Sequence, residues 1–101
     1  MRLTEFEKIS IIDEAIKCYD ENVSVILFGS RVNDSKKGGD IDLLIIPSIY
    51  PDDSILFDKK IKFLESLKDR IGDQKIDVVI KKIYDSRNII NTALETGLNL
   101  C

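Results

Sequence analysis

The spacing of apolar residues along the chain changes several times, and each change marks a new secondary-structure element. Thr4 and Glu7 have the spacing of a capping box, which predicts that a helix begins there and ends near Glu21 and Asn22. Its apolar residues recur every three or four positions: Phe6, Ile9, Ile12, Ile16 and Tyr19.

Three short apolar runs rich in β-branched residues predict buried strands at residues 23–28, 40–46 and 75–80. Pro47 ends the second run. A second helical stripe, expected to pack in the core, consists of Leu56, Phe57, Ile61, Leu64, Leu67 and Ile71, with Gly72 as its C-cap. Residues 85–96 predict a last amphipathic helix, whose apolar side either covers the sheet or contacts a partner.

The predicted order is helix, strand, turn, strand, helix, strand, helix. This order favours the α+β (mixed α/β) class, with a small mixed sheet of at least three strands packed against helices. A length of 101 residues, with 44% hydrophobic and 33% charged residues, indicates one globular domain over residues 1–101.

Composition excludes several classes of function. A net charge of −3 argues against a general nucleic-acid-binding surface. The chain has no histidine, which excludes Ser-His-Asp and Cys-His mechanisms. Cys18 and Cys101 belong to no CxxC motif, so neither a zinc site nor a disulfide framework is indicated. No signal-peptide or membrane-spanning pattern occurs, so we expect a cytoplasmic protein that does not contact a membrane.

Acidic residues interrupt two of the predicted strands. Asp40 and Asp42 are two positions apart, so their side chains project from the same face, opposite the apolar Ile41 and Leu43. Two close carboxylates repel each other unless a cation neutralises them, and Mg²⁺ prefers such oxygen ligands. If the third strand lies beside the second, Asp77 completes a three-carboxylate cluster suited to two metal ions.

Gly29 and Ser30 follow the first predicted strand and suggest an anion site. Glycine lets the backbone approach a phosphate closely, and a following helical turn directs N–H groups toward the anion. Taken singly, this pair is an ordinary turn, Asp77 is a solvent-facing residue, and Lys36 and Lys37 are a solvated loop. Together, a phosphate site beside a metal site is what a nucleoside triphosphate requires.

The segment "FGSRVNDSKKGGDIDLLI" resembles the GS…DxD signature of the DNA polymerase β-like nucleotidyltransferase superfamily. The flanking helices and "IDVVI" also fit, and the short length looks like the minimal nucleotidyltransferases (MNT). Many of these are antitoxins encoded beside a small helical HEPN toxin. The chain departs from the family pattern in having nine residues between Ser30 and Asp40, one fewer than the commonest spacing, and no glycine four residues after the serine.

The resemblance implies the nucleotidyltransferase fold and roles for six residues. The nucleotide-binding residues would be Gly29, Ser30 and Arg31, and the catalytic and metal-binding residues would be Asp40, Asp42 and Asp77. It further implies two Mg²⁺ ions, ATP as substrate, and transfer of AMP to a hydroxyl of a HEPN-type partner. Two alternatives stay open. One is a non-catalytic module that neutralises its helical partner by binding. The other is an aminoglycoside nucleotidyltransferase acting alone, which would need a substrate domain for which this chain has no room.

Overall fold

The computed structural model describes residues 2–32 and 39–101. The predicted turn residues between 33 and 38, with Lys36 and Lys37, lie outside this part. The elements in chain order are α1 (Glu5–Cys18), β1 (Ser24–Phe28), the 3₁₀ turn η1 (Gly29–Val32), β2 (Ile41–Ile46), α2 (Asp53–Ile71), β3 (Ile76–Ile80), α3 (Asn88–Thr96) and β4 (Leu98–Asn99).

The strands form one mixed sheet in the order β3-β2-β1-β4. β1 is antiparallel to both β2 and β4, whereas β2 and β3 are parallel. The predicted α+β class and the adjacency of the second and third predicted strands are therefore confirmed. The prediction missed β4, because two residues after Gly97 are too short to show an alternating pattern.

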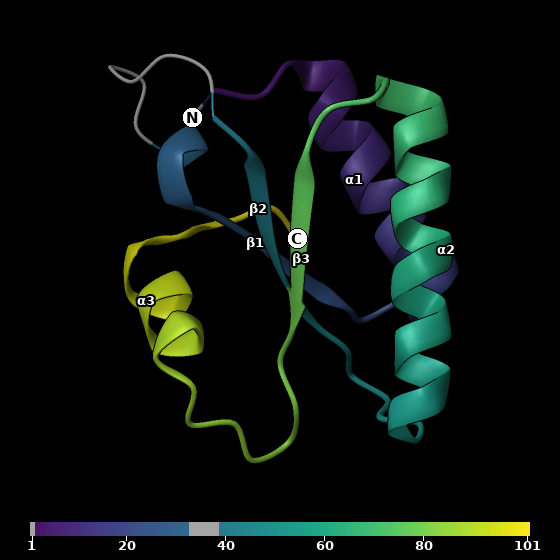
Figure 1. Cartoon of the computed structure of the whole chain (residues 1–101), viewed down its shortest axis with the longest axis vertical. Coiled ribbons are helices and arrows are strands. Elements are labelled where there is room, and N and C mark those ends of the chain that lie inside the picture. The colour runs from purple at the N-terminus through teal and green to yellow at the C-terminus, as the bar shows by residue number, and fades with distance from the viewer. Residues whose placement is uncertain (1, 33–38) are drawn as a thin grey trace.

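Helices cover both faces of the sheet. Figure 1 shows α1 and α2 side by side on one face and the short α3 on the other. The main core lies under α1 and α2 and includes Leu27, Leu43 and Phe63, each fully buried. A smaller cluster under α3 consists of Phe28, Leu44, Ile90 and Ala93. Because α3 is short, it covers only part of its face of the sheet (Figure 1).

The predicted apolar stripe of α1 is only partly correct, since Tyr19 is buried and Ile12 packs against the core but the other members are exposed. The helix buries Ser10, Ile11, Glu14 and Ala15. Phe6 and Ile9, which the periodicity assigned to the stripe, are 56% and 47% exposed. Isoleucines at several positions around the helix fit more than one stripe, so spacing alone did not identify the buried face.

The helix boundaries also differ from the prediction. α1 ends at Cys18, and the carboxylate of Asp20 then accepts hydrogen bonds from the backbone N–H groups of Asn22, Ser48 and Ile49. α3 begins at Asn88 instead of Asp85.

The Asp85 carboxylate explains the late start of α3. It accepts from the backbone N–H groups of Lys82 and Arg87, so it closes a turn instead of starting a helix.

The predicted apolar stripe of α2, which begins at Asp53, is only partly buried. Phe63 is fully buried, while Phe57 and Ile61 of the predicted stripe are 61% and 40% exposed. Across the described ranges, no helix is long and apolar enough to cross a bilayer.

A partly buried ion pair joins α1 to α2. Glu14 is only 6% exposed, and Nη1 of Arg70 lies 3.1 Å from its Oε2. We expect Arg70→Met to lower the free energy of unfolding by about 2–3 kcal/mol, because the Glu14 carboxylate loses its guanidinium partner. Urea unfolding measures the change.

The double variant Glu14→Leu/Arg70→Met is the matched control. Replacing both members of a buried pair by apolar residues is often neutral, so we expect stability close to that of the unaltered protein. An Arg70→Met protein that unfolds at the unaltered urea midpoint would contradict the assignment of this pair as a stabilising contact.

Candidate active site

Asp42 and Asp77 lie directly opposite each other on β2 and β3. The charge of the Asp77 carboxyl acts on the Asp42 carboxyl across this pair. The parallel register produces this pairing, because each aspartate occupies the second position of its strand. Both side chains project from the face of the sheet that α3 covers in part, since their neighbours Ile41, Leu43 and Val78 are buried in the main core.

The surroundings of Asp42 disfavour its ionised form. Burial raises the pKa of the Asp42 carboxyl, and the charges of Asp77 and Asp40 raise it further. The nearby Lys75 ammonium partly opposes this rise in the pKa of Asp42. A divalent cation between the carboxylates would remove this repulsion, so the charges of the pair favour binding of such a cation.

Asp40 lies just outside the strand and is engaged with a lysine. β2 begins at Ile41, and Nζ of Lys75 lies 3.3 Å from Oδ2 of Asp40. This hydrogen-bonded pairing raises the pKa of Lys75. Within the described ranges, no three His, Cys, Asp or Glu side chains are arranged as a ready-made metal site. The structure therefore brings Asp42 and Asp77 together and leaves Asp40 beside them, bound to Lys75.

Gly29 lies against the Asp42 carboxylate. Its φ of +75° belongs to the left-handed region, which L-residues with a side chain rarely adopt. A Cβ at this position would lie 2.3 Å from Oδ2 of Asp42, closer than any real contact. Only glycine therefore fits here, and the start of η1 is in direct contact with the acidic pair.

Ser30 lies against Gly39, on the other side of the segment that precedes Asp40. A Cβ built on Gly39, whose φ is +94°, would lie 2.1 Å from Oγ of Ser30. Arg2 donates from Nη2 to the carbonyl of Ser30 over 3.0 Å. The Gly29–Ser30 turn and the residues that lead into β2 are thus held close together.

Arg31 binds protein groups on three sides. Its Nη1 donates to the carbonyl of Arg2 over 2.8 Å, and its Nε donates to the carbonyl of Gly39 over 3.3 Å. Nη2 donates to Oε1 of Gln74 over 3.2 Å, and Nε2 of Gln74 in turn donates to Glu7. These hydrogen bonds link η1 to the N-terminal segment and to the residues before β3, so in this structure the guanidinium stabilises the position of η1.

We expect Arg31→Lys to weaken the fold around the turn. An ammonium on a flexible stem cannot reproduce the three-sided contacts of a guanidinium, and their loss should cost about 1–2 kcal/mol of unfolding free energy. Urea unfolding measures it, and Gln74→Met, which removes the Arg31 contact together with the hydrogen bonds of Gln74 to Glu7 and Ile71, should also destabilise the protein. Unchanged stability with weakened ATP binding would instead support a direct nucleotide-binding role for Arg31.

Three residues at the site escaped the sequence analysis. Lys75 is two positions before Asp77 in the third predicted strand. Residues two apart on a strand project from the same face, so this spacing was a usable signal that Lys75 lies beside the carboxylates. Arg2 and Gln74 had no such signal. Their contacts with η1 depend on the tertiary fold, which brings residues 28 and 43 positions apart in sequence into contact.

The residues present fit a magnesium ion. Mg²⁺ is usually held by one or two protein carboxylates together with substrate phosphates, so Asp42 and Asp77 suffice as a starting set. Asp40 can join them if Lys75 releases it. The glycine at position 29 lets the backbone of the turn lie directly against the Asp42 carboxylate, so the turn and the acidic pair meet at one place.

Comparison with known proteins gives one finding. A family model described as polymerase beta, nucleotidyltransferase matches residues 10–101, which includes every strand and all the acidic residues of the site. No curated protein matches the chain significantly.

Proposed function

Since the chain belongs to the polymerase β nucleotidyltransferase family, we propose that it transfers AMP from ATP to a hydroxyl group of a partner protein. The observation that carries the proposal is the pairing of Asp42 with Asp77 on adjacent parallel strands, with the Asp42 carboxylate against the turn at Gly29. Membership of the family supports nucleotidyl transfer in general. The nucleotide, the metal and the acceptor are our proposal.

The acidic residues would hold magnesium, and the turn would hold the triphosphate. Asp42, Asp77 and Asp40 would supply the protein ligands for two Mg²⁺ ions. When bound, Mg²⁺ neutralises phosphate charge and stabilises the oxygens of the displacement. The start of η1 offers backbone N–H groups beside the carboxylates, and the Ser30 hydroxyl can donate a further hydrogen bond to a phosphate oxygen.

The proposed reaction is an in-line displacement at the α-phosphorus of ATP. The acceptor oxygen forms a bond to this phosphorus while the bond to the bridging oxygen of the β-phosphate breaks, so that pyrophosphate leaves. The acceptor hydroxyl loses its proton, and we assign its acceptance to Asp77, the exposed member of the pair. Positioning and charge neutralisation supply most of the acceleration.

For the acceptor we propose a small helical HEPN-type protein that this chain neutralises as an antitoxin in the cytoplasm. The support is the resemblance of the GS…DxD segment to that of the minimal nucleotidyltransferases. The alternative is neutralisation by binding alone, with the acidic pair unused. The two functions differ in whether the partner becomes covalently modified.

A labelling experiment separates them. The chain is incubated with Mg²⁺ and its helical partner, in parallel with ATP labelled at the α- or the γ-phosphate. We expect label on a hydroxyl residue of the partner from α-labelled ATP only, and none when EDTA replaces Mg²⁺. A partner that is neutralised with no gain of an AMP group in its mass would overturn the proposed transfer and support the binding module.

A further inference from the structure

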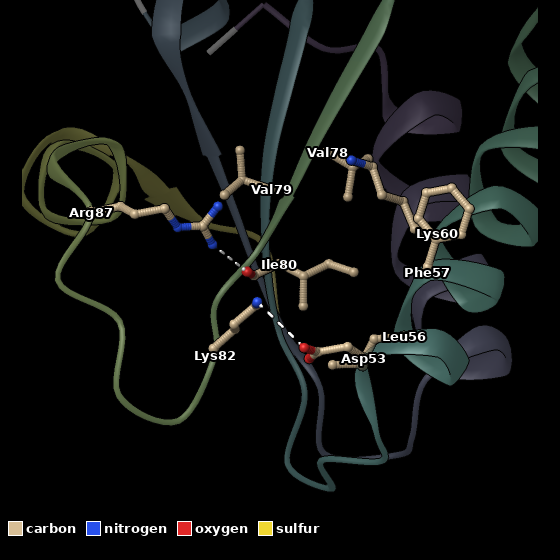
Figure 2. Close-up of a pocket in the computed structure, with 9 residues that line it drawn as sticks. All are labelled: Asp53, Leu56, Phe57, Lys60, Val78, Val79, Ile80, Lys82 and Arg87. Carbon is tan, nitrogen blue, oxygen red and sulfur yellow. Dashed lines mark hydrogen bonds and ion pairs between the residues drawn. The ribbon is translucent and has the colours of Figure 1, made fainter.

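A groove runs along the free edge of the sheet, outside the acidic site. It has a volume of about 350 Å³ and lies between β3, the N-terminal half of α2 and the segment after β3. Figure 2 shows its lining, which consists of Asp53, Leu56, Phe57, Lys60, Val78, Val79, Ile80, Lys82 and Arg87. Val78 and Val79 point to opposite faces of the sheet, so the strand edge itself lies in the groove.

The backbone of β3 presents hydrogen-bonding groups to this groove. Lys75 accepts from Ile41 and Lys81 donates to Ile45, so these two residues direct their backbone groups toward β2. Because the direction alternates along a strand, the N–H and C=O groups of Ile76, Val78 and Ile80 point away from the sheet. Of these groups, the Ile80 carbonyl accepts a hydrogen bond from Nη2 of Arg87 over 2.8 Å.

The side chains around this edge are apolar at the base and cationic at the rim. Phe57 is 61% exposed, next to the buried Leu56. Three cations and one carboxylate line the groove, in a chain whose net charge is −3.

Two of the three rim cations, Lys60 and Lys82, are only weakly neutralised, whereas Arg87 forms an ion pair with Asp85, its Nη2 2.7 Å from Oδ2. Lys60 makes no ion pair or hydrogen bond with the part of the chain that the structure describes. Nζ of Lys82 lies 3.7 Å from Oδ2 of Asp53, and both side chains are mostly exposed, so this pair is weak. The groove is therefore a locally positive, partly apolar site on an acidic protein.

We propose that this groove binds an extended acidic segment of the acceptor protein, which adds a strand to β3. The added strand would pair with the outward backbone groups of Ile76 and Val78, place apolar side chains on Phe57, and place carboxylates near Lys60 and Lys82. A segment paired with β3 passes directly beside Asp77, since Asp77 lies between Ile76 and Val78. The inference rests on the proposed function for its statement that this segment carries the hydroxyl that receives AMP.

The test uses the whole protein to select binding peptides from a library, and it needs no ATP. A phage-displayed library of linear 12-residue peptides is enriched on the immobilised protein, and bound peptides are mapped by backbone amide chemical shifts and hydrogen exchange. We expect peptides in which Asp or Glu alternates with apolar residues, with slowed exchange at Ile76 and Val78. Lys60→Glu should weaken binding about tenfold or more, whereas Lys62→Glu, an exposed lysine of α2 outside the groove, should leave it unchanged.

Three outcomes would overturn the inference. They are a failure to enrich peptides above the level seen with Lys60→Glu, peptides that bind away from β3, and self-pairing of two copies through β3, which sedimentation would detect as a dimer lost in Lys60→Glu. Failure of the proposed function appears elsewhere: groove-bound peptides with no transfer of AMP to the partner would contradict the transfer and leave the docking site standing. Transfer that Lys60→Glu does not alter would contradict the docking site alone.

Discussion

Replacing Asp42 by asparagine is expected to reduce AMP transfer by about 10³-fold or more, since a metal ligand at the reacting phosphate contributes several kcal/mol. Asparagine keeps the shape of the side chain and removes the charge that would bind Mg²⁺. The rate of label incorporation from α-labelled ATP measures the loss. Asp77→Asn should have a comparable effect, because the two carboxyl groups act as one pair.

The Asp42→Asn variant should be more stable than the unaltered protein when EDTA is present. Burial and the charges of Asp77 and Asp40 raise the pKa of Asp42 above its unfolded value, so ionisation at neutral pH destabilises the folded state. The unfolding free energy of the unaltered protein should therefore fall as pH rises from the unfolded pKa through the raised folded pKa. Asp42→Asn should lack this contribution to the slope.

Asp20→Asn is the matched control for this argument. Burial alone raises the pKa of Asp20, but hydrogen bonds from Ser48, Ile49 and Asn22 outweigh it and lower the pKa. Removing this charge should therefore destabilise the protein and leave transfer intact. An Asp42→Asn protein that is both less stable in EDTA and fully active would contradict the account of the acidic pair.

Gly29→Ala should also reduce activity, though less than the loss of either aspartate. The added Cβ would lie 2.3 Å from Oδ2 of Asp42, so the carboxylate must leave its place beside Asp77. A displacement of about 1 Å at a reacting centre can cost about 10²-fold in rate. The left-handed φ adds a backbone cost of about 1 kcal/mol to the stability loss. Transfer rate and urea midpoint are measured together.

Gly72→Ala separates the contact from the backbone strain. Gly72, the C-cap of α2, has a φ of +92°, and a Cβ there would meet nothing within 4 Å. We expect a similar loss of stability with no loss of transfer. If both alanine variants lost activity equally, strain alone would explain Gly29→Ala, and the contact with Asp42 would have no catalytic meaning.

The acidic pair was predictable because its position depends on strand periodicity. Asp42 and Asp77 each interrupt an apolar run, and a parallel pairing of these runs is enough to bring them together. The hydrogen bonds of Arg31 with Arg2 and Gln74 were not predictable, because only the tertiary fold brings these residues together. The resemblance placed Arg31 at the nucleotide, whereas its side chain hydrogen-bonds to other residues of the protein, and Arg31→Lys tests which role matters.

Element type was easier to predict than the buried face of a helix. The three predicted strands are correct to within one residue, since β-branched runs bounded by Asn22, Gly29 or Pro47 leave little choice. In α1 and α2, apolar residues lie on more than one side. Some, such as Ile9 and Phe57, stay exposed although their spacing is helical. Phe57 lines the groove beside β3, which gives its exposure a proposed purpose.

The most direct test of the central claim locates the metal in the folded protein. Mn²⁺, used in place of Mg²⁺, broadens the NMR signals of nearby nuclei, so a titration with ATP present maps its position. We predict broadening centred on the backbone amides of Gly29, Asp42 and Asp77, and its loss in Asp42→Asn. Broadening centred elsewhere on the protein, or unchanged in that variant, would contradict a metal–triphosphate site at the acidic pair.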